Sequence, residues 1–165
     1  MTARIANARF AHTNIVAVDW RRLADFYVSV FGCEYVPPER DLSGSEFARG
    51  VGVPDARLHG IHVRLPGYGP DGPTLEIFQY DPLPERPATA VNRPGFAHIA
   101  FVVDDLELAR EAVIAAGGRA VGDVVTTPVG DGRSVSWCYL TDPEGNIIEL
   151  QVRMSNGNES TSARA

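Results

Sequence analysis

The chain has 165 residues, of which 44% are hydrophobic and 22% charged, and its formal net charge is −6. This length suits one well-buried domain or two small halves that share a core, and the composition is ordinary for a globular protein. The negative charge argues against nucleic acid as a partner, because phosphate binding requires a basic surface. No apolar segment is long enough to cross a membrane, and the first residues lack the apolar core of a signal peptide.

Two cysteines, Cys33 and Cys138, belong to no CxxC or disulfide-rich pattern. Isolated cysteines of this kind are typical of the reducing cytosol, where thiols stay free. The sequence therefore predicts a cytoplasmic protein with two reduced, structural cysteines.

In the first half, the predicted order is strand, helix and three strands. Residues 8–18 read as a strand, and Asp19 is the predicted N-cap of a helix that ends at Gly32. The apolar stripe of this helix consists of Trp20, Leu23, Ala24, Tyr27 and Phe31. Residues 33–36 predict a short strand that ends at Pro37-Pro38, and the segment 39–55 gives no clear signal. Two further strands are predicted at residues 57–65 and 74–80.

A proline-rich linker, residues 82–94, separates this half from a second one with the same order of elements. The second half begins with a strand at 95–103 and a helix capped by Asp104 in a capping box with Glu107. The apolar stripe of this helix is Leu106, Ala109, Ala112, Val113 and Ala116, followed by Gly117-Gly118. Strands are predicted at 119–126, 133–141 and 146–153. The predicted organisation is a first module at 1–81, the linker, a second module at 95–153 and a disordered tail at 154–165.

The two halves are copies of one unit at an offset of 86 residues. The segment 9–19 matches the segment 95–105, with a Phe-Ala-His sequence in each, and the match continues without a gap to Gly32 and Gly118. A match of this length indicates two copies of one supersecondary unit. Each half therefore places a histidine in its opening strand.

The ends of the two halves also match. Leu75-Glu76-Ile77 closes the first and Ile148-Glu149-Leu150 closes the second, so each glutamate faces away from its aliphatic neighbours. A buried glutamate is costly unless it is paired or bound to a cation. If the halves pack about a pseudo-twofold axis, two imidazoles and two carboxylates converge. This donor set suits one divalent ion, namely Zn, Ni, Co, Mn or Fe(II), and does not suit calcium.

Other polar residues have simpler interpretations. His59 and His62 lie an odd number of residues apart on one strand, so they face opposite sides and are predicted to be surface residues. Trp137 and Tyr139 share a strand face, where either core packing or a place in a pocket is compatible with the pattern. The segment 142–145, Asp-Pro-Glu-Gly, is a predicted turn without a catalytic role.

The two βαβββ units, the Phe-Ala-His repeat and the ending Asp-Pro-Glu-Gly-Asn-Ile-Ile-Glu at 142–149 resemble the vicinal oxygen chelate superfamily. That superfamily includes glyoxalase I, methylmalonyl-CoA epimerase, extradiol dioxygenases, and fosfomycin and bleomycin resistance proteins. The resemblance covers about residues 8–153. It implies an α+β fold in which two tandem βαβββ modules form a curled mixed-sheet cup, the glyoxalase / bleomycin resistance / dioxygenase fold.

Carried over by position, the resemblance implies His12, Glu76, His98 and Glu149 as ligands of one divalent metal ion. This His/Glu/His/Glu set is similar to that of bacterial glyoxalase I. The epimerase has glutamine at the position of Glu76, and the dioxygenases and fosfomycin transferases use three ligands. The long segment 39–73 departs from glyoxalase I, and no arginine in it matches a glutathione-binding residue.

The resemblance further implies a lyase or isomerase that removes a proton next to a metal-bound carbonyl group. Glu149 is the expected base, with Glu76 as a second catalytic residue on the opposite side of the substrate. The expected partner is a small molecule with adjacent oxygens, and related proteins commonly form homodimers. A ring-cleaving extradiol dioxygenase and an antibiotic-binding resistance protein are the alternatives. A scaffold that keeps the four residues without using them is a further one.

Overall fold

A computed structural model describes residues 5–154 of the chain. Two compact units make up the chain, residues 1–86 and 87–165, and the division falls inside the predicted linker. Met154, the first residue of the predicted tail, is the last residue of a strand. The rest of that tail, residues 155–165, lies outside the described part of the chain.

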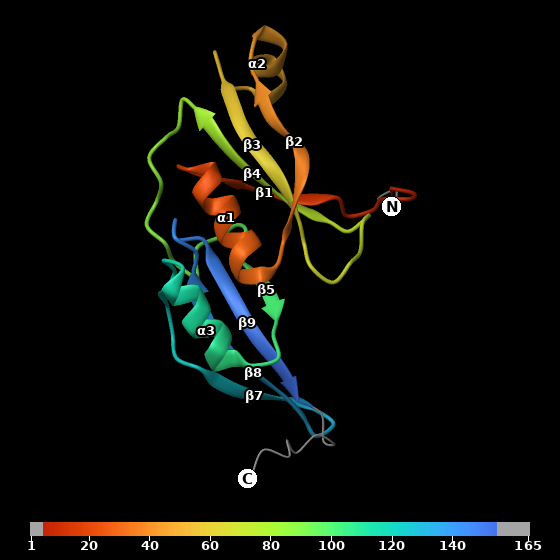
Figure 1. The fold of residues 1–165 in the computed structure, drawn as a ribbon, viewed down its shortest axis with the longest axis vertical. Coiled ribbons are helices and arrows are strands. Elements are labelled where there is room, and N and C mark those ends of the chain that lie inside the picture. Colours follow the sequence, from red (N-terminus) through yellow and green to blue (C-terminus); the bar gives the residue numbers. More distant parts are fainter. Residues whose placement is uncertain (1–4, 155–165) are drawn as a thin grey trace. The chain divides into compact units, whose positions relative to one another are not determined.

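The first unit is a four-stranded mixed sheet with a helix packed on one face (Figure 1). Its elements are β1 (His12–Val16), α1 (Trp20–Phe31), β2 (Glu34–Leu42), α2 (Ser45–Val51), β3 (Arg57–Arg64) and β4 (Thr74–Asp81). The strand order is β1-β4-β3-β2, with β1 and β4 parallel and the other two pairs antiparallel. The helix α1 contacts β3 and β4, which places the core of this unit between them.

The ends of α1 are those that the sequence predicts. The Asp19 side chain accepts a hydrogen bond from the backbone N–H of Arg22 at 3.1 Å, and Gly32 adopts a left-handed φ of 68° at the C-terminal end. The predicted stripe is buried except for the partly exposed Phe31. Burial of each large apolar side chain of this kind stabilises the fold by roughly 1.5–3 kcal/mol.

The strand β2 differs from the prediction, which ended it at Pro37-Pro38. It continues through both prolines and pairs with β3 on either side of a register break between Val36 and Arg40. An edge strand accommodates proline where the ladder requires no N–H donor, and β2 is the edge strand of its sheet. The segment that gave no clear signal contains the end of β2 and the short helix α2.

The second unit repeats this plan with a five-stranded mixed sheet. Its elements are β5 (His98–Val102), α3 (Leu106–Ala115), β6 (Arg119–Ala120), β7 (Val125–Gly130), β8 (Arg133–Thr141) and β9 (Ile147–Met154). The order is β5-β9-β8-β6, with β5 and β9 parallel and β7 also paired with β8. The helix α3 contacts β8 and β9 (Figure 1).

Two details of this unit depart from the sequence prediction. The predicted strand 119–126 is divided into β6 and β7, because the backbone N–H groups of Val121 and Gly122 both donate to the carbonyl of Tyr139. Two residues that face one partner residue interrupt a ladder in the manner of a β-bulge.

The cap of α3 is Asp105 and not Asp104, since the Asp105 side chain accepts from the backbone N–H of Leu108 at 2.9 Å. With this start, Glu107 lies too early in the helix to complete a capping box. Of the predicted stripe, the buried members are Leu106 and Val113, and the exposed members are Ala112 and Ala116.

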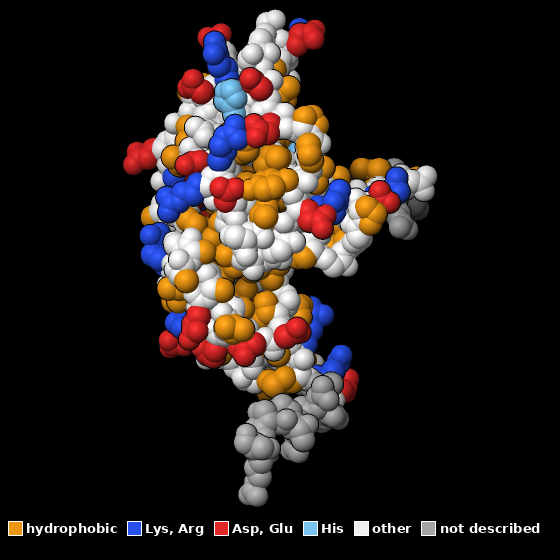
Figure 2. Space-filling model, viewed as in Figure 1, with side chains coloured by type: hydrophobic (Ala, Val, Ile, Leu, Met, Phe, Trp, Pro, Cys, Tyr) orange, Lys and Arg blue, Asp and Glu red, His pale blue; other side chains and the backbone are white. Residues whose placement is uncertain are grey.

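The predicted α+β class is confirmed, with two sheets of mixed strands and few helices. Cys33 and Cys138 are both free and buried, and burial raises the pKa of the Cys33 thiol to about 11. On the face in Figure 2, acidic and basic side chains are interspersed. Within residues 5–154, no helix is long and apolar enough to span a membrane.

Candidate functional site

In the first unit, polar side chains gather on the sheet face that points away from α1. The alternation along β3 and β4 turns Ile61, Leu75 and Ile77 into the core under the helix. His62 and Glu76, one residue along each strand, therefore lie on the other face. His62 and Glu76 are direct partners in the β3–β4 register, so the fold places the two side chains next to each other.

On this face, two imidazoles bracket one carboxylate. His12 Nε2 lies 3.3 Å from Glu76 Oε2, and His62 Nε2 lies 3.1 Å from Glu76 Oε1. The two imidazole rings are edge to face, with centroids 5.8 Å apart. The Glu76 side chain is only 16% exposed, and these two imidazoles are its close neighbours.

The prediction that His59 and His62 are both surface residues is wrong for His62. His59 is exposed, but the His62 side chain is as enclosed as that of Glu76, and its Nδ1 lies 2.9 Å from Thr74 Oγ1. Burial lowers the pKa of His62 most, and Arg40 lowers it further, whereas the Glu76 charge raises it. Strand alternation correctly predicted that His59 and His62 face opposite sides of the sheet. It did not show which side carries the candidate site.

The second unit brings together the other predicted pair. His98 Nε2 lies 3.0 Å from Glu149 Oε2, and the Glu149 side chain is 17% exposed. Tyr139 lies beside them, with its ring centroid 5.1 Å from that of His98 and 5.1 Å from that of Trp137. Burial, followed by the Glu149 charge, raises the pKa of the Tyr139 phenol. Tyr139 therefore belongs to the candidate site and is not solely a packing residue.

The sheet registers show that the two clusters are structural equivalents. In the first unit, Glu76 is the register partner of Asn14 on β1 and of His62 on β3. In the second unit, Glu149 is the register partner of Ala100 on β5 and of Tyr139 on β8. On the strand that runs parallel to the glutamate strand, each histidine lies two residues before the residue that pairs with the glutamate. His12 thus precedes Asn14, and His98 precedes Ala100. The position of His62 in the first unit is thus the position of Tyr139 in the second.

Each His–Glu pair has a separation compatible with two ligands of one ion, and so has the His62–Glu76 pair at 3.1 Å. With metal–ligand bonds of about 2.0–2.2 Å, two ligand atoms at neighbouring coordination positions lie roughly 2.9–3.4 Å apart. The separations of 3.3 Å for His12–Glu76 and 3.0 Å for His98–Glu149 fall in this range. Two imidazoles and two carboxylates are also the donor set of a transition-metal ion.

Neither unit forms a complete metal site by itself. Among the described residues, no group of three or more His, Cys, Asp and Glu side chains could hold a metal ion. The grouping of all four predicted ligands around one ion stays a prediction.

The Asp142–Gly145 segment is a turn with a structural role. The Asp142 carboxylate is fully buried and accepts hydrogen bonds from the backbone N–H groups of Glu144 and Asn146, each at 2.9 Å. It also accepts one from the Asn146 side chain at 2.6 Å. These bonds hold the β8–β9 connection in place and use the carboxylate for structure.

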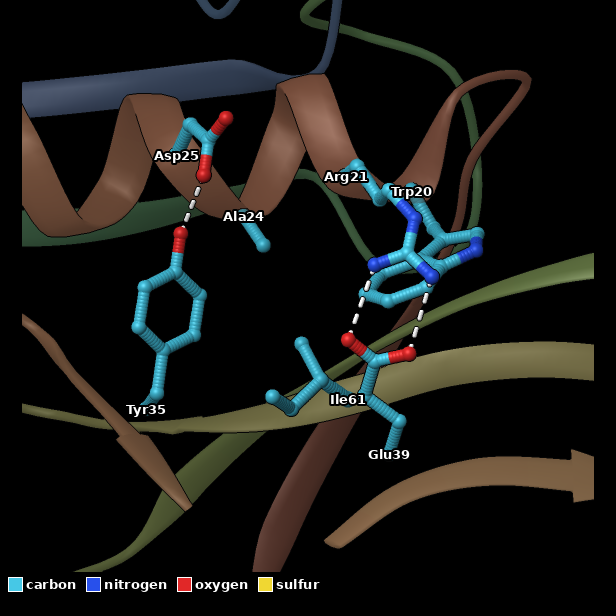
Figure 3. A pocket seen from close by; sticks show the side chains of 7 residues that line it. All are labelled: Trp20, Arg21, Ala24, Asp25, Tyr35, Glu39 and Ile61. Atoms are coloured by element: carbon cyan, nitrogen blue, oxygen red, sulfur yellow. Dashed lines mark hydrogen bonds and ion pairs between the residues drawn. The ribbon is translucent and has the colours of Figure 1, made fainter. Parts of the chain in front are cut away.

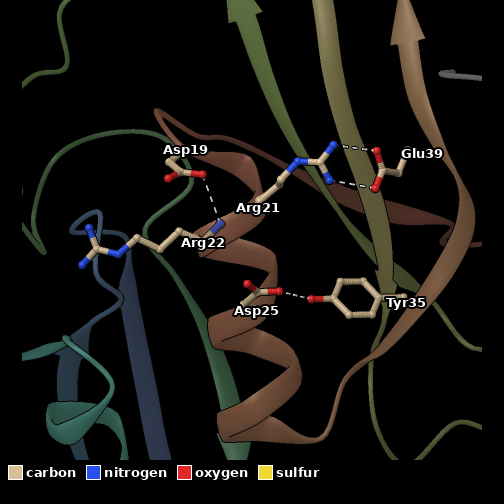
Figure 4. A network of polar contacts seen from close by, with 6 residues as sticks. All are labelled: Asp19, Arg21, Arg22, Asp25, Tyr35 and Glu39. Carbon is tan, nitrogen blue, oxygen red and sulfur yellow. Dashed lines mark hydrogen bonds and ion pairs between the residues drawn. The ribbon is translucent and has the colours of Figure 1, made fainter.

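A separate hollow of about 340 Å³ lies in the first unit between α1, β2 and β3 (Figure 3). It is lined by Trp20, Arg21, Ala24, Asp25, Tyr35, Glu39 and Ile61. The charged groups along it are paired with each other (Figure 4): both Arg21 guanidinium nitrogens donate to Glu39 at 2.8 Å, and the Tyr35 hydroxyl donates to Asp25. Ile61, whose side chain faces α1, borders this hollow, so it is distinct from the histidine clusters.

Comparisons with known proteins agree with this architecture. The family model of the Glyoxalase/Bleomycin resistance protein/Dioxygenase superfamily matches residues 9–150. The crystal structure of a glyoxalase family protein from Bacillus cereus aligns with a TM-score of 0.66 at 18% identity, covering 93% of this chain and 97% of that one. No curated protein sequence matches the chain.

Two further solved structures share the fold. A glyoxalase family protein from Enterococcus faecalis aligns with a TM-score of 0.54 at 21% identity, covering 88% of this chain and 97% of that one. A glyoxalase/bleomycin resistance protein/dioxygenase family enzyme from Burkholderia phytofirmans aligns with a TM-score of 0.55 at 16% identity, covering 88% of this chain and 98% of that one.

Proposed function

Because the chain belongs to the Glyoxalase/Bleomycin resistance protein/Dioxygenase superfamily, we propose that it is a divalent-metal-dependent lyase or isomerase. In this proposal the protein takes a proton from the carbon atom next to a carbonyl group and returns it to the same carbon or a neighbouring one. The observation that carries the proposal is the presence of one imidazole–carboxylate pair in each unit, at equivalent positions of the two sheets. A structural scaffold does not require two such pairs, since a partly buried carboxylate is costly without a functional gain.

The proposed ligands are His12, Glu76, His98 and Glu149, and the proposed ion is Zn, Ni, Co, Mn or Fe(II). Imidazole and carboxylate donors favour these ions over calcium, which takes oxygen ligands. When bound, such an ion supplies Lewis-acid polarisation of a substrate carbonyl oxygen.

Glu149 is the proposed base. It takes the proton from the carbon next to the carbonyl group and returns it to the same carbon or a neighbouring one. Among residues 5–154, His98 is the basic side chain within 4 Å of the Glu149 carboxylate, whereas Glu76 lies as close to both His12 and His62. A carboxylate with fewer partners leaves its position at a lower cost, which favours Glu149 for this role and leaves Glu76 as the weaker, second base.

The ligand set also indicates the class of substrate. Four protein ligands would leave about two positions on an octahedral ion, which two adjacent oxygens of one small molecule would suit. A ring-cleaving dioxygenase requires a further position for O₂, so Glu76 favours the lyase or isomerase reaction. Binding proteins for antibiotics tend to lack the ligand set, which favours an enzyme over that alternative.

The proposed setting is the cytoplasm, since both cysteines are free. We also propose that two chains form a homodimer, which lets equivalent units pair either within one chain or between two.

Exchange of a substrate hydrogen with deuterated solvent tests the proposed reaction. Metal-loaded protein is incubated in D₂O with 2-oxo hemithioacetals and acyl-CoA thioesters, and the carbon-bound hydrogen next to the carbonyl is followed by NMR. We expect exchange with at least one class, and loss of that exchange in Glu149→Gln. Consumption of O₂ with a catechol, without exchange in any carbonyl compound, would instead assign the chain to the dioxygenases.

A further inference from the structure

Both nitrogens of the His62 ring have a polar partner. Nδ1 lies 2.9 Å from the Thr74 hydroxyl oxygen and Nε2 lies 3.1 Å from Glu76 Oε1. The ring also packs edge to face against His12 and Phe78, with centroids 5.8 Å and 5.7 Å away. These contacts fix both the position and the rotation of the imidazole.

The chemistry of the partners determines where the proton of a neutral His62 ring lies. An ionised carboxylate can only accept a hydrogen bond, so Nε2 must carry the hydrogen that faces Glu76. Nδ1 is then an acceptor, and the Thr74 hydroxyl is a suitable donor for it. The Thr74 hydroxyl is thus hydrogen-bonded to Nδ1 of His62, Nε2 lies against one oxygen of Glu76, and the other oxygen of Glu76 faces His12.

We propose that His62 is a positioning residue, which holds Oε1 of Glu76 so that Oε2 is presented to the metal beside His12 Nε2. The inference rests on the proposed function, because it assigns a role toward the proposed ion. In this proposal His12 and Glu76 Oε2 face the ion, and His62 acts on the other oxygen, Oε1. Glu76 thereby becomes a fixed ligand.

The second unit lacks this arrangement. Tyr139 occupies the position of His62. Ile147 pairs with His98 in the sheet, as Thr74 pairs with His12 in the first unit. Isoleucine has no hydroxyl group and cannot orient a ring by a hydrogen bond. Glu149 consequently has no oriented imidazole on its second oxygen.

Metal affinity tests the role of His62, measured by competition of the full chain with a chromophoric chelator for Zn²⁺. Loss of a group that orients a ligand typically weakens metal binding by about 10- to 100-fold, which is the expected result for His62→Leu. His62→Gln places an amide N–H near the former Nε2, so we expect affinity within about threefold of the wild type. His59→Leu, on the same strand and exposed, is the matched control and should bind like the wild type.

Wild-type affinity in His62→Leu would overturn the inference, and so would equal losses in His62→Leu and His62→Gln. A second readout needs no metal. In the metal-free chain at pH 8, ¹⁵N NMR of the His62 ring should show the neutral form protonated on Nε2, and Thr74→Val should weaken this preference. A neutral form protonated on Nδ1 would contradict the proposed role of His62 toward Glu76. If the wild-type chain bound no Zn²⁺, the proposed function would fail, while the NMR result would still decide whether His62 orients Glu76.

Discussion

The two units share a backbone plan and a His–Glu pair, but they differ in the third residue beside that pair. In the first unit, His62 contacts the second oxygen of Glu76, whereas Tyr139 of the second unit packs its ring against His98. Under the proposed function, the repeat supplies equal ligands in the two units but unequal chemistry. One carboxylate is held from both sides, and the other is held from one side.

The largest expected effect is on hydrogen exchange, when Glu149 and Glu76 are substituted one at a time. Loss of a general base typically costs 10²- to 10⁴-fold in rate, so Glu149→Gln should reduce hydrogen exchange by about 10³-fold. Because an amide oxygen still coordinates, Glu149→Gln should retain part of its metal. Glu76→Gln should reduce exchange less than Glu149→Gln at saturating metal. Equal losses of exchange in the two variants, at equal metal occupancy, would contradict the division of roles.

A second test places a histidine in the second unit at the position equivalent to His62. The double variant Tyr139→His with Ile147→Thr gives Glu149 an oriented imidazole, and we expect exchange to fall by about tenfold while metal affinity is retained. Ile147→Thr alone is the control, since it adds the hydroxyl group without the imidazole and should retain exchange within about threefold. NMR would first show that the new imidazole contacts Glu149. If exchange were then unchanged in the double variant, holding the Glu149 carboxylate in place would not be what limits exchange.

The connections between the last two strands of each unit also differ. The β8–β9 turn depends on the buried Asp142, whereas exposed Asp71 lies in the β3–β4 connection. Asp142→Ala leaves buried donors unsatisfied and should lower the free energy of unfolding by about 2–3 kcal/mol. Asp71→Ala should change it by less than about 0.5 kcal/mol. Urea denaturation followed by circular dichroism measures both, and similar values would show that Asp142 does not organise its turn.

The smallest expected effect on the two units comes from dimer formation, because it leaves the chemistry of each unit intact. Light scattering at micromolar concentration should give the mass of a homodimer. A monomer mass would rule out the dimer and restrict the pairing of the two units to a single chain.

The sequence predicted the features that depend on local chemistry or on the repeat. Asp19 and Gly32 bound α1 as expected, because capping requires only residues near each helix end. The repeat also located both His–Glu pairs, because the same order of strands in the two copies brings equivalent residues to equivalent register positions. The cap of α3 was misplaced by one residue because two consecutive aspartates fit the same pattern.

Features that depend on tertiary pairing were missed. β2 continues through Pro37-Pro38 because it is an edge strand with a register break, which no local signal shows. His62 was missed because the repeat has tyrosine at its equivalent position, so matching the two halves could not find it. The only available signal was the alternation that puts His62 on the face opposite Ile61 and Val63.

The central claim is that both His–Glu pairs serve one ion, and the stoichiometry of metal binding tests it most directly. Isothermal titration of the metal-free chain with Zn²⁺ should show one ion per chain. His12→Ala and His98→Ala should each weaken that single site by at least about 100-fold, while His59→Ala should leave it unchanged. Two independent ions per chain, or a site that survives His98→Ala with full affinity, would contradict the account.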